Sequence, residues 1–257
     1  MSPSNTCLNC DNITSGKFCN NCGQKTATHR IDLKHFVTHD LLHGVWHLER
    51  GIFFTLKEAI LRPGKAALDY IKGKRIRYYN VFYLALLVIG LNILLLHFKD
   101  IQLEKTAEVV NNNKNTLNDF VSKYSKIILF CIVPIFSINA KMIFKRLKLN
   151  IAEHFILGGI TLLGLLISSS ILFLFGILDN TFNSSFFRFS KFPIALFILF
   201  FPAWSYFNAT KKLYTFWGFL WRIISFYILT FLEFLLIIIF ITAVILKDNN
   251  IPIEINI

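Results

Sequence analysis

The sequence predicts an all-α membrane protein with about five transmembrane helices, amphipathic interfacial helices and a small N-terminal ribbon built on four cysteines. First, 54% of the 257 residues are hydrophobic and only 16% are charged, which is too apolar for an ordinary soluble domain. Second, the apolar residues concentrate after Asn80, whereas the preceding positions are polar and basic. Third, all but one of the 5 cysteines lie within residues 7–22.

Long apolar segments define a predicted transmembrane bundle over residues 81–250. A helix needs about 20 mainly apolar residues to cross roughly 30 Å of hydrocarbon. The segments that come close to this length are 81–98, 127–144, 155–178, 192–209 and 222–246. The second and fourth fit less well, because Lys141 lies near the end of one and Pro202 lies inside the other.

Basic residues predict how the bundle is oriented. Lys and Arg collect before the first predicted span and in the links after the second and the fourth, and the remaining links are poor in them. Because cytoplasmic loops carry the excess of Lys and Arg, this alternation predicts a cytoplasmic N-terminus and an external C-terminus. The first long apolar run begins only at residue 81, so nothing before it resembles a secretory signal.

The cysteine cluster, within a predicted ribbon over residues 1–28, reads "CLNCDNITSGKFCNNC". Two C-x2-C knuckles can direct four thiolates at one tetrahedral zinc ion, and we expect Gly16 and Gly23 to supply the tight bends. Rubredoxin-like iron is the main alternative. Because sulfur would fill every coordination position, the metal should be structural and not catalytic. The predicted ligands are Cys7, Cys10, Cys19 and Cys22.

A ribbon of this size has almost no apolar core, so it should fold only with metal bound. Such ribbons bind protein or nucleic acid, or cap a chain end. Few basic or aromatic residues are interleaved with the cysteines, which makes nucleic acid an unlikely ligand. The fifth cysteine, Cys131, lies in an apolar run and is interpreted as a core residue.

The stretch "KHFVTHDLLHGVWHLERG" places histidine at every fourth position. On a helix these histidines share one side, opposite an apolar stripe of Leu and Val. The first and last, His35 and His47, would lie about 18 Å apart along the axis, so only neighbours can share an ion. A hydrated helix face, a pH-responsive face and a second metal or polar site remain open. The residues for that second site are His39, Asp40, His43, His47, Glu153 and His154.

Residues 29–80 are predicted to form amphipathic interfacial helices and a basic juxtamembrane segment. One helix should end at Leu61, with a break at Pro63 before a second helix that ends near Lys72. Basic residues beside apolar faces at a membrane entrance favour contact with anionic lipid headgroups, although the positive-inside rule alone would also account for them. The candidate headgroup ligands are Lys72, Lys74, Arg75 and Arg77.

Glu233 stands near the middle of the fifth predicted span, where a carboxylate is costly and usually faces a bundle interior or an aqueous cavity. Asn92, Asn139 and the serines at 168–170 could form hydrogen bonds with it or between helices. No catalytic motif, phosphate loop, internal repeat or pair of broken spans is present, which argues against an enzyme and against known transporter patterns.

Several blocks occur in a distinctive order: "CGQ" after the knuckles, then "THRIDLKHF", "HDLLHGVWHLERGIFFTLKEAILRPG" and "YIKGKRIRYYN" before the first span. This order, over about residues 7–83, resembles a Bacteroidota family of zinc-ribbon, multi-pass membrane proteins known as domain of unknown function 3667. The resemblance implies a protein of the bacterial inner membrane with a ribbon head, and it implies no reaction.

The leading hypothesis is a non-enzymatic membrane protein. Its cytosolic ribbon and histidine-rich helix would dock a protein partner or organise the cytosolic mouth of the bundle. The alternative is a membrane-embedded, metal-dependent enzyme or transporter that uses the second site. A third hypothesis is a path for protons or small solutes through Glu233. The sequence does not indicate an oligomeric state.

Overall fold

The computed structural model describes residues 6–26, 51–107, 131–211 and 213–248. In these ranges the regular secondary structure is helical, apart from isolated β-bridges that pair Thr6 with Ile13 and Phe18 with Lys25. The predicted all-α class is therefore confirmed.

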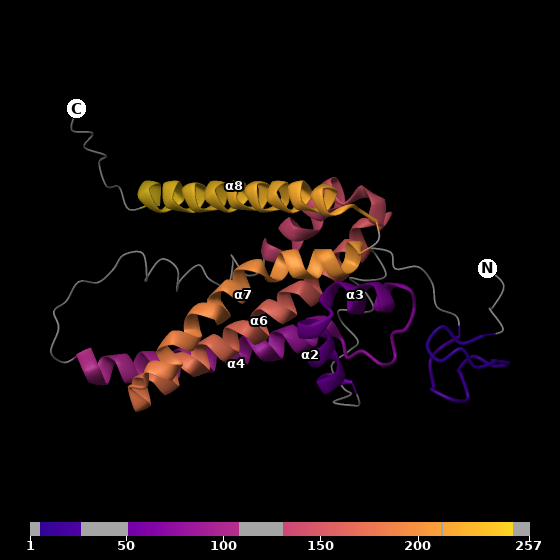
Figure 1. Ribbon diagram of the computed structural model, residues 1–257, viewed down its shortest axis with the longest axis horizontal. Helices are drawn as coiled ribbons and strands as arrows, with labels where there is room; N and C mark the ends of the chain where they lie inside the picture. The colour runs from indigo at the N-terminus through magenta and orange to yellow at the C-terminus, as the bar shows by residue number, and fades with distance from the viewer. Residues whose placement is uncertain (1–5, 27–50, 108–130, 212, 249–257) are drawn as a thin grey trace.

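Long helices make up most of the described chain (Figure 1). Within the described residues, 4 helices are long and apolar enough to cross a membrane, which confirms the membrane class. They contain the first, third, fourth and fifth predicted spans. These helices are α4 (Val81–Ala107), α6 (Ile151–Phe182), α7 (Ser185–Thr210) and α8 (Phe216–Asp248).

The second predicted span corresponds to a shorter apolar helix, Cys131–Ile143. It directly follows residues outside the described ranges. α4 leads away from the side where the ribbon lies and α6 starts on that side, so the chain returns to it between Ala107 and Ile151 (Figure 1). The helix Cys131–Ile143 lies in that interval.

One end of the bundle gathers the basic segments. α4, α6 and α8 begin, and α7 ends, at the side where the ribbon lies, which we call the ribbon end (Figure 1). The short 3-10 helix Lys145–Leu147 is tied to the α7–α8 link there, because Arg146 donates a 2.8 Å hydrogen bond to the Leu213 carbonyl. The guanidinium groups of Arg146 and Arg222 both lie over the Tyr214 ring, at 5.1 and 4.3 Å from its centroid.

α6 is the central helix, and small residues let its neighbours approach closely. A Cβ atom on Gly158 would lie 3.0 Å from Ser137 Oγ, and one on Gly159 would lie 3.1 Å from the Phe82 ring. Glycine at these positions therefore permits close approach of the neighbouring helices. The N-terminus of α6 is fixed by a capping box in which Asn150 and Glu153 exchange hydrogen bonds of 2.8 Å.

Two short helices precede the first long one. α2 (Ile52–Leu61) and α3 (Pro63–Ile71) are separated at Arg62, as the sequence predicts, and proline occupies the first position of α3. Both pack against α6, and α3 also packs against α7. They are therefore part of the helical bundle and not a separate unit.

α7 carries Pro202 in its interior, which removes a backbone donor from the helix. Beside it, the Tyr227 hydroxyl of α8 donates a 2.7 Å hydrogen bond to the Leu199 carbonyl and accepts one of 3.3 Å from the Ala203 amide. The hydroxyl thus bridges two backbone groups next to the proline, and it joins α8 to α7.

Candidate metal centre

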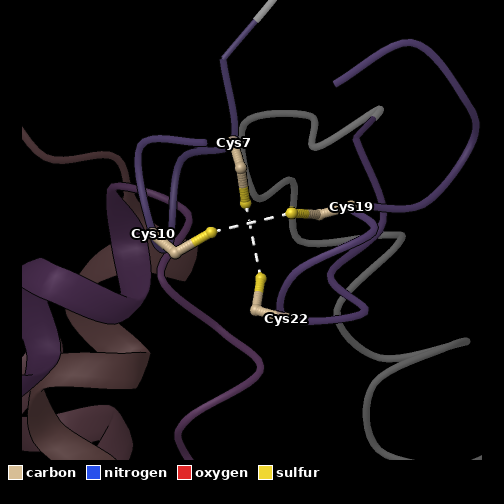
Figure 2. Close-up of side chains that lie close together, drawn as sticks. All are labelled: Cys7, Cys10, Cys19 and Cys22. Carbon is tan, nitrogen blue, oxygen red and sulfur yellow. Dashed lines mark hydrogen bonds between the residues drawn. The ribbon is translucent and has the colours of Figure 1, made fainter. Parts of the chain in front are cut away.

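The four ribbon cysteines point their sulfur atoms at a common centre (Figure 2). All four Sγ atoms lie within 4.8 Å of one another, with separations of 3.5 Å for Cys7–Cys22 and 3.6 Å for Cys10–Cys19. Around a metal with bonds to sulfur of about 2.3 Å, the edges of a tetrahedron are about 3.8 Å long. The donor set therefore fits one tetrahedral metal ion.

Each knuckle repeats the same backbone pattern. The Cys7 amide donates to the Asn12 carbonyl at 2.8 Å and the Asp11 amide donates to Cys7 at 2.9 Å. In the second knuckle, the Cys19 amide donates to Gln24 and the Gly23 amide donates to Cys19, both at 2.8 Å. Backbone hydrogen bonds therefore hold the two halves of the site in equivalent conformations.

The bend residues differ from the expectation in one position. Gly23 has a φ of 74°, as expected for a left-handed bend, and the equivalent residue of the first knuckle is Asp11, with a φ of 58°. Gly16 lies in the link between the knuckles and has no positive φ. Gly16 does lie at a bend, as expected, and Asp11 is a further bend residue that the sequence did not indicate, because aspartate also tolerates the left-handed region.

Hydrogen bonds favour the metal-binding form of one thiol. Burial raises the pKa of Cys22, but hydrogen bonds from the Gln24 backbone and the Asn9 side chain, together with the neighbouring cysteines, lower it to about 6. The thiolate is the form that ligates metal. Cys7 and Cys19 are buried, at 3% and 2% exposure, so half of the donor set is shielded from solvent.

The ribbon is joined to the basic juxtamembrane segment by polar contacts from both knuckles. Arg77 donates from Nε to Asn9 Oδ1 at 2.8 Å and from Nη2 to the Asn9 carbonyl at 2.7 Å. Gln24 donates to the Gly73 carbonyl at 2.7 Å and accepts a 3.4 Å bond from the Ile76 amide. We call this set of contacts the ribbon clamp.

Close packing accompanies the ribbon clamp. Gly73 has a φ of 101°, and a Cβ atom there would lie 2.8 Å from the Leu8 side chain. A Cβ atom on Gly23 would lie 3.7 Å from the end of Ile76. The turn at 73–76 therefore fits against the two knuckles, and glycine at 73 permits both its backbone conformation and the contact with Leu8.

The candidate headgroup ligands have partners within the protein. Besides Arg77, Lys74 forms an ion pair with Asp69 at 3.4 Å, and the Arg75 guanidinium lies 5.8 Å from the centroid of the Tyr70 ring. Lys72 is exposed. Contact between these residues and lipid headgroups stays a prediction.

Most of the candidate second site lies outside the described residues, namely His39, Asp40, His43 and His47. Of its other members, Glu153 belongs to the capping box of α6. His154 is 2% exposed, and its Nδ1 atom has no hydrogen-bond partner. In the described part of the chain, the four cysteines are the group that brings three or more potential metal ligands together.

Glu233 meets a polar partner from the helix Cys131–Ile143. Asn139 Nδ2 donates to Glu233 Oε2 at 2.6 Å and to Thr230 Oγ1 at 3.1 Å, and Asn139 is fully buried. The expected bond between Asn139 and Glu233 is therefore present. Asn92 instead donates to the Leu166 carbonyl at 3.1 Å, which joins α4 to α6.

Asn9, Gln24 and Asp11 are the functional residues that the sequence reasoning did not identify. Their only signal was position: Asn9 lies inside the first knuckle, and Gln24 follows the last cysteine by two residues. Polar residues at such positions are common in ribbons of any use, so the pattern alone could not indicate their contacts with residues 73–77.

No curated protein and no solved structure matches the chain. A family model described as "Protein of unknown function (DUF3667)" matches residues 49–89. The match covers α2, α3, the basic segment and the start of α4, and the four ribbon cysteines lie before it. In that region the chain is similar to a family whose function is unknown.

Proposed function

We propose that this chain is a non-enzymatic, multi-pass protein of the bacterial inner membrane, with its ribbon in the cytoplasm. The ribbon holds a structural zinc ion and fixes the segment that enters the first span. Through the ribbon clamp, the ribbon fixes the arrangement of the chain at the cytosolic end of the bundle.

The contact between Asn9 and Arg77 carries this proposal. Asn9 lies between Cys7 and Cys10, so the bound metal fixes its position. Arg77 lies four residues before Val81, where α4 begins. The Arg77 guanidinium donates two hydrogen bonds to Asn9, both shorter than 3 Å, and they make a directional link between the two residues.

Metal binding supplies the folding energy for the clamp. The ribbon has few buried apolar side chains, and small four-cysteine units gain much of their stability from the metal. Without metal, four thiols at these distances have no strong attraction for one another, so the knuckles should open. Gln24 and Asn9 would then lose their positions relative to residues 73–77.

A reducing cytosol keeps the four thiols free to bind either zinc or iron. Zinc is favoured because structural sites with this cysteine spacing usually hold zinc. Elemental analysis of protein purified without added metal tests this choice. We expect one zinc per chain in the wild type and in Cys131→Ser, and none in Cys10→Ser. Iron in place of zinc would overturn the metal assignment, and no bound metal in the wild type would overturn the ribbon.

The orientation is supported by the gathering of basic segments at the ribbon end. A protease added to sealed, right-side-out membrane vesicles should leave the ribbon intact and should cut it only after the vesicles are opened. Cleavage in intact vesicles would place the ribbon outside and would contradict the proposal.

Partner docking is a second role, favoured by two exposed apolar side chains of the ribbon. Ile13 is 76% exposed and Phe18 is 58% exposed. Both take part in the bridges that close the knuckles. If a protein partner binds there, Ile13→Ser together with Phe18→Ser should abolish its co-purification and leave the zinc content unchanged. Retained co-purification would exclude this surface.

A further inference from the structure

α2 exposes large apolar side chains and buries polar ones. Its exposed face carries Phe53 at 88%, Leu61 at 52% and Phe54 at 37% exposure. Its buried residues are Thr55 at 1%, Glu58 at 4% and Ala59 at 1% exposure. At 100° per residue the exposed apolar side chains share one stripe about 100° wide, which also contains the exposed Lys57.

α2 and α3 also reach far along the long helices. A Cβ atom on Gly164 of α6 would lie 2.7 Å from the Ala59 carbonyl of α2, and it would collide with the Phe201 ring of α7. A Cβ atom on Gly64, at the start of α3, would collide with the Ser205 carbonyl and the Ala209 amide of α7. The connection between α2 and α3 therefore packs closely against both α6 and α7.

The depth of this contact can be measured along the two long helices. Gly164 follows Phe155, the first residue of the apolar run of α6, by nine residues, or about 14 Å. Phe201 precedes Thr210, the last residue of α7, by nine residues, which is again about 14 Å. Both values approach half of the roughly 30 Å of hydrocarbon that a span crosses.

The start of α2 lies nearer the membrane entrance, because Thr55 accepts a 2.8 Å hydrogen bond from the Tyr79 amide, two residues before α4. The helix therefore deepens toward Ala59.

The charged groups of α2 are either paired or long enough to reach the headgroups, as a position in an apolar layer requires. The buried Glu58 carboxylate pairs with Arg62 at 2.5 Å, so it is not left as an isolated charge. The side chain of Arg62 is 48% exposed. Long basic side chains such as Arg62 and Lys57 can extend toward the headgroups while their stems stay in an apolar layer.

We propose that α2 and α3 form a re-entrant helix pair inserted into the cytosolic half of the membrane, with the outer stripe of α2 in contact with lipid acyl chains. α4, α7 and α8 also expose large apolar side chains. The inference rests on the membrane class and, for the cytosolic side, on the proposed orientation, and it is independent of the zinc and the ribbon clamp.

A helix surrounded by water at the cytosolic end of the bundle would show the opposite pattern. Its apolar stripe would face the bundle, and Glu58 would face water, because burying a carboxylate without need is costly. The outward position of Phe53 therefore favours hydrocarbon as its surroundings. The test must also exclude an arrangement in which other residues of this chain, or a second copy of it, cover Phe53.

Fluorine NMR in lipid nanodiscs tests the proposal with conservative labels. Three samples each carry 4-fluorophenylalanine at one position. Phe53 is the test position, Phe18 of the ribbon is the water-exposed control, and Phe231 of α8, 67% exposed, is the lipid-exposed control. Each sample is measured with dissolved oxygen, which concentrates in hydrocarbon, and with a water-soluble nickel chelate.

At Phe53 we expect the broadening by oxygen to exceed that by nickel, in a ratio several-fold above that at Phe18 and below that at Phe231, which lies nearer the middle of a span. A ratio equal to that at Phe18 would place α2 in water and overturn the proposal. Little broadening by either reagent would show that protein covers Phe53, which would also overturn it.

Discussion

Arg77, four residues before the first span, donates two hydrogen bonds to Asn9, which lies between two of the four cysteines of the ribbon. The residues are 68 positions apart in the chain. This contact links the candidate metal centre directly to the segment that enters the first span.

The coupling between Asn9 and Arg77 should be measurable by a double-mutant cycle. We expect Asn9→Ala and Arg77→Met each to make the ribbon lose zinc faster to a chelator, with an interaction energy of about 1 kcal/mol between them. Lys72→Met is the matched control, since it removes the same charge from an exposed position. Additive effects of Asn9→Ala and Arg77→Met would contradict a direct contact.

The two ribbon glycines should respond differently to alanine. Gly23→Ala forces a side chain into a left-handed conformation, and we expect it to weaken zinc retention by about 1 kcal/mol. Gly16→Ala should retain zinc as the wild type does, because the nearest atom to its Cβ would be the Phe18 carbonyl oxygen, 3.9 Å away. Equal losses in both variants, measured by competition with a chelator, would argue against the described knuckles.

Tyr227 should stabilise α7 beside Pro202. Tyr227→Phe removes the hydroxyl that bridges Leu199 and Ala203, and we expect the free energy of unfolding in detergent to fall by about 1–2 kcal/mol. Thr242→Val, which removes only a bond to the carbonyl of its own helix, is the control and should cost little. Similar stability of Tyr227→Phe and the wild type would show that the bridge contributes nothing.

Variants of Glu233, which accepts a hydrogen bond from Asn139, distinguish a structural role from a proton pathway. Glu233→Gln keeps an acceptor for Asn139, so it should preserve stability, whereas Glu233→Leu leaves the buried amide with one partner fewer and should cost about 1–3 kcal/mol. Thermal unfolding of the purified variants measures this difference. A change in proton flux of proteoliposomes with Glu233→Gln, at unchanged stability, would support the pathway and contradict a purely structural role.

Local features of the sequence predicted much of the fold. The break at Pro63 and the end of α2 at Leu61 follow from backbone chemistry within a few residues. The convergence of the four thiols follows from the spacing of two knuckles. Such features need no knowledge of the remaining chain, which explains why they could be recognised before the structure was known.

Long-range contacts could not be predicted in this way. No periodicity relates Asn9 to Arg77, and nothing in the spacing of Gln24 points to Gly73. The stripe of Phe53 and Leu61 was visible as amphipathic, but its direction depends on what surrounds the helix. In water such a stripe faces the protein, whereas in a membrane it can face outward.

Hydrogen–deuterium exchange of residues 72–79, with and without metal, tests the central claim most directly. The Ile76 amide is bonded to Gln24, and its neighbours depend on the same turn. We expect removal of zinc by a chelator to accelerate exchange in this segment and to leave exchange in α6 unchanged. Loss of zinc without any change in residues 72–79 would show that the ribbon does not fix the membrane entrance.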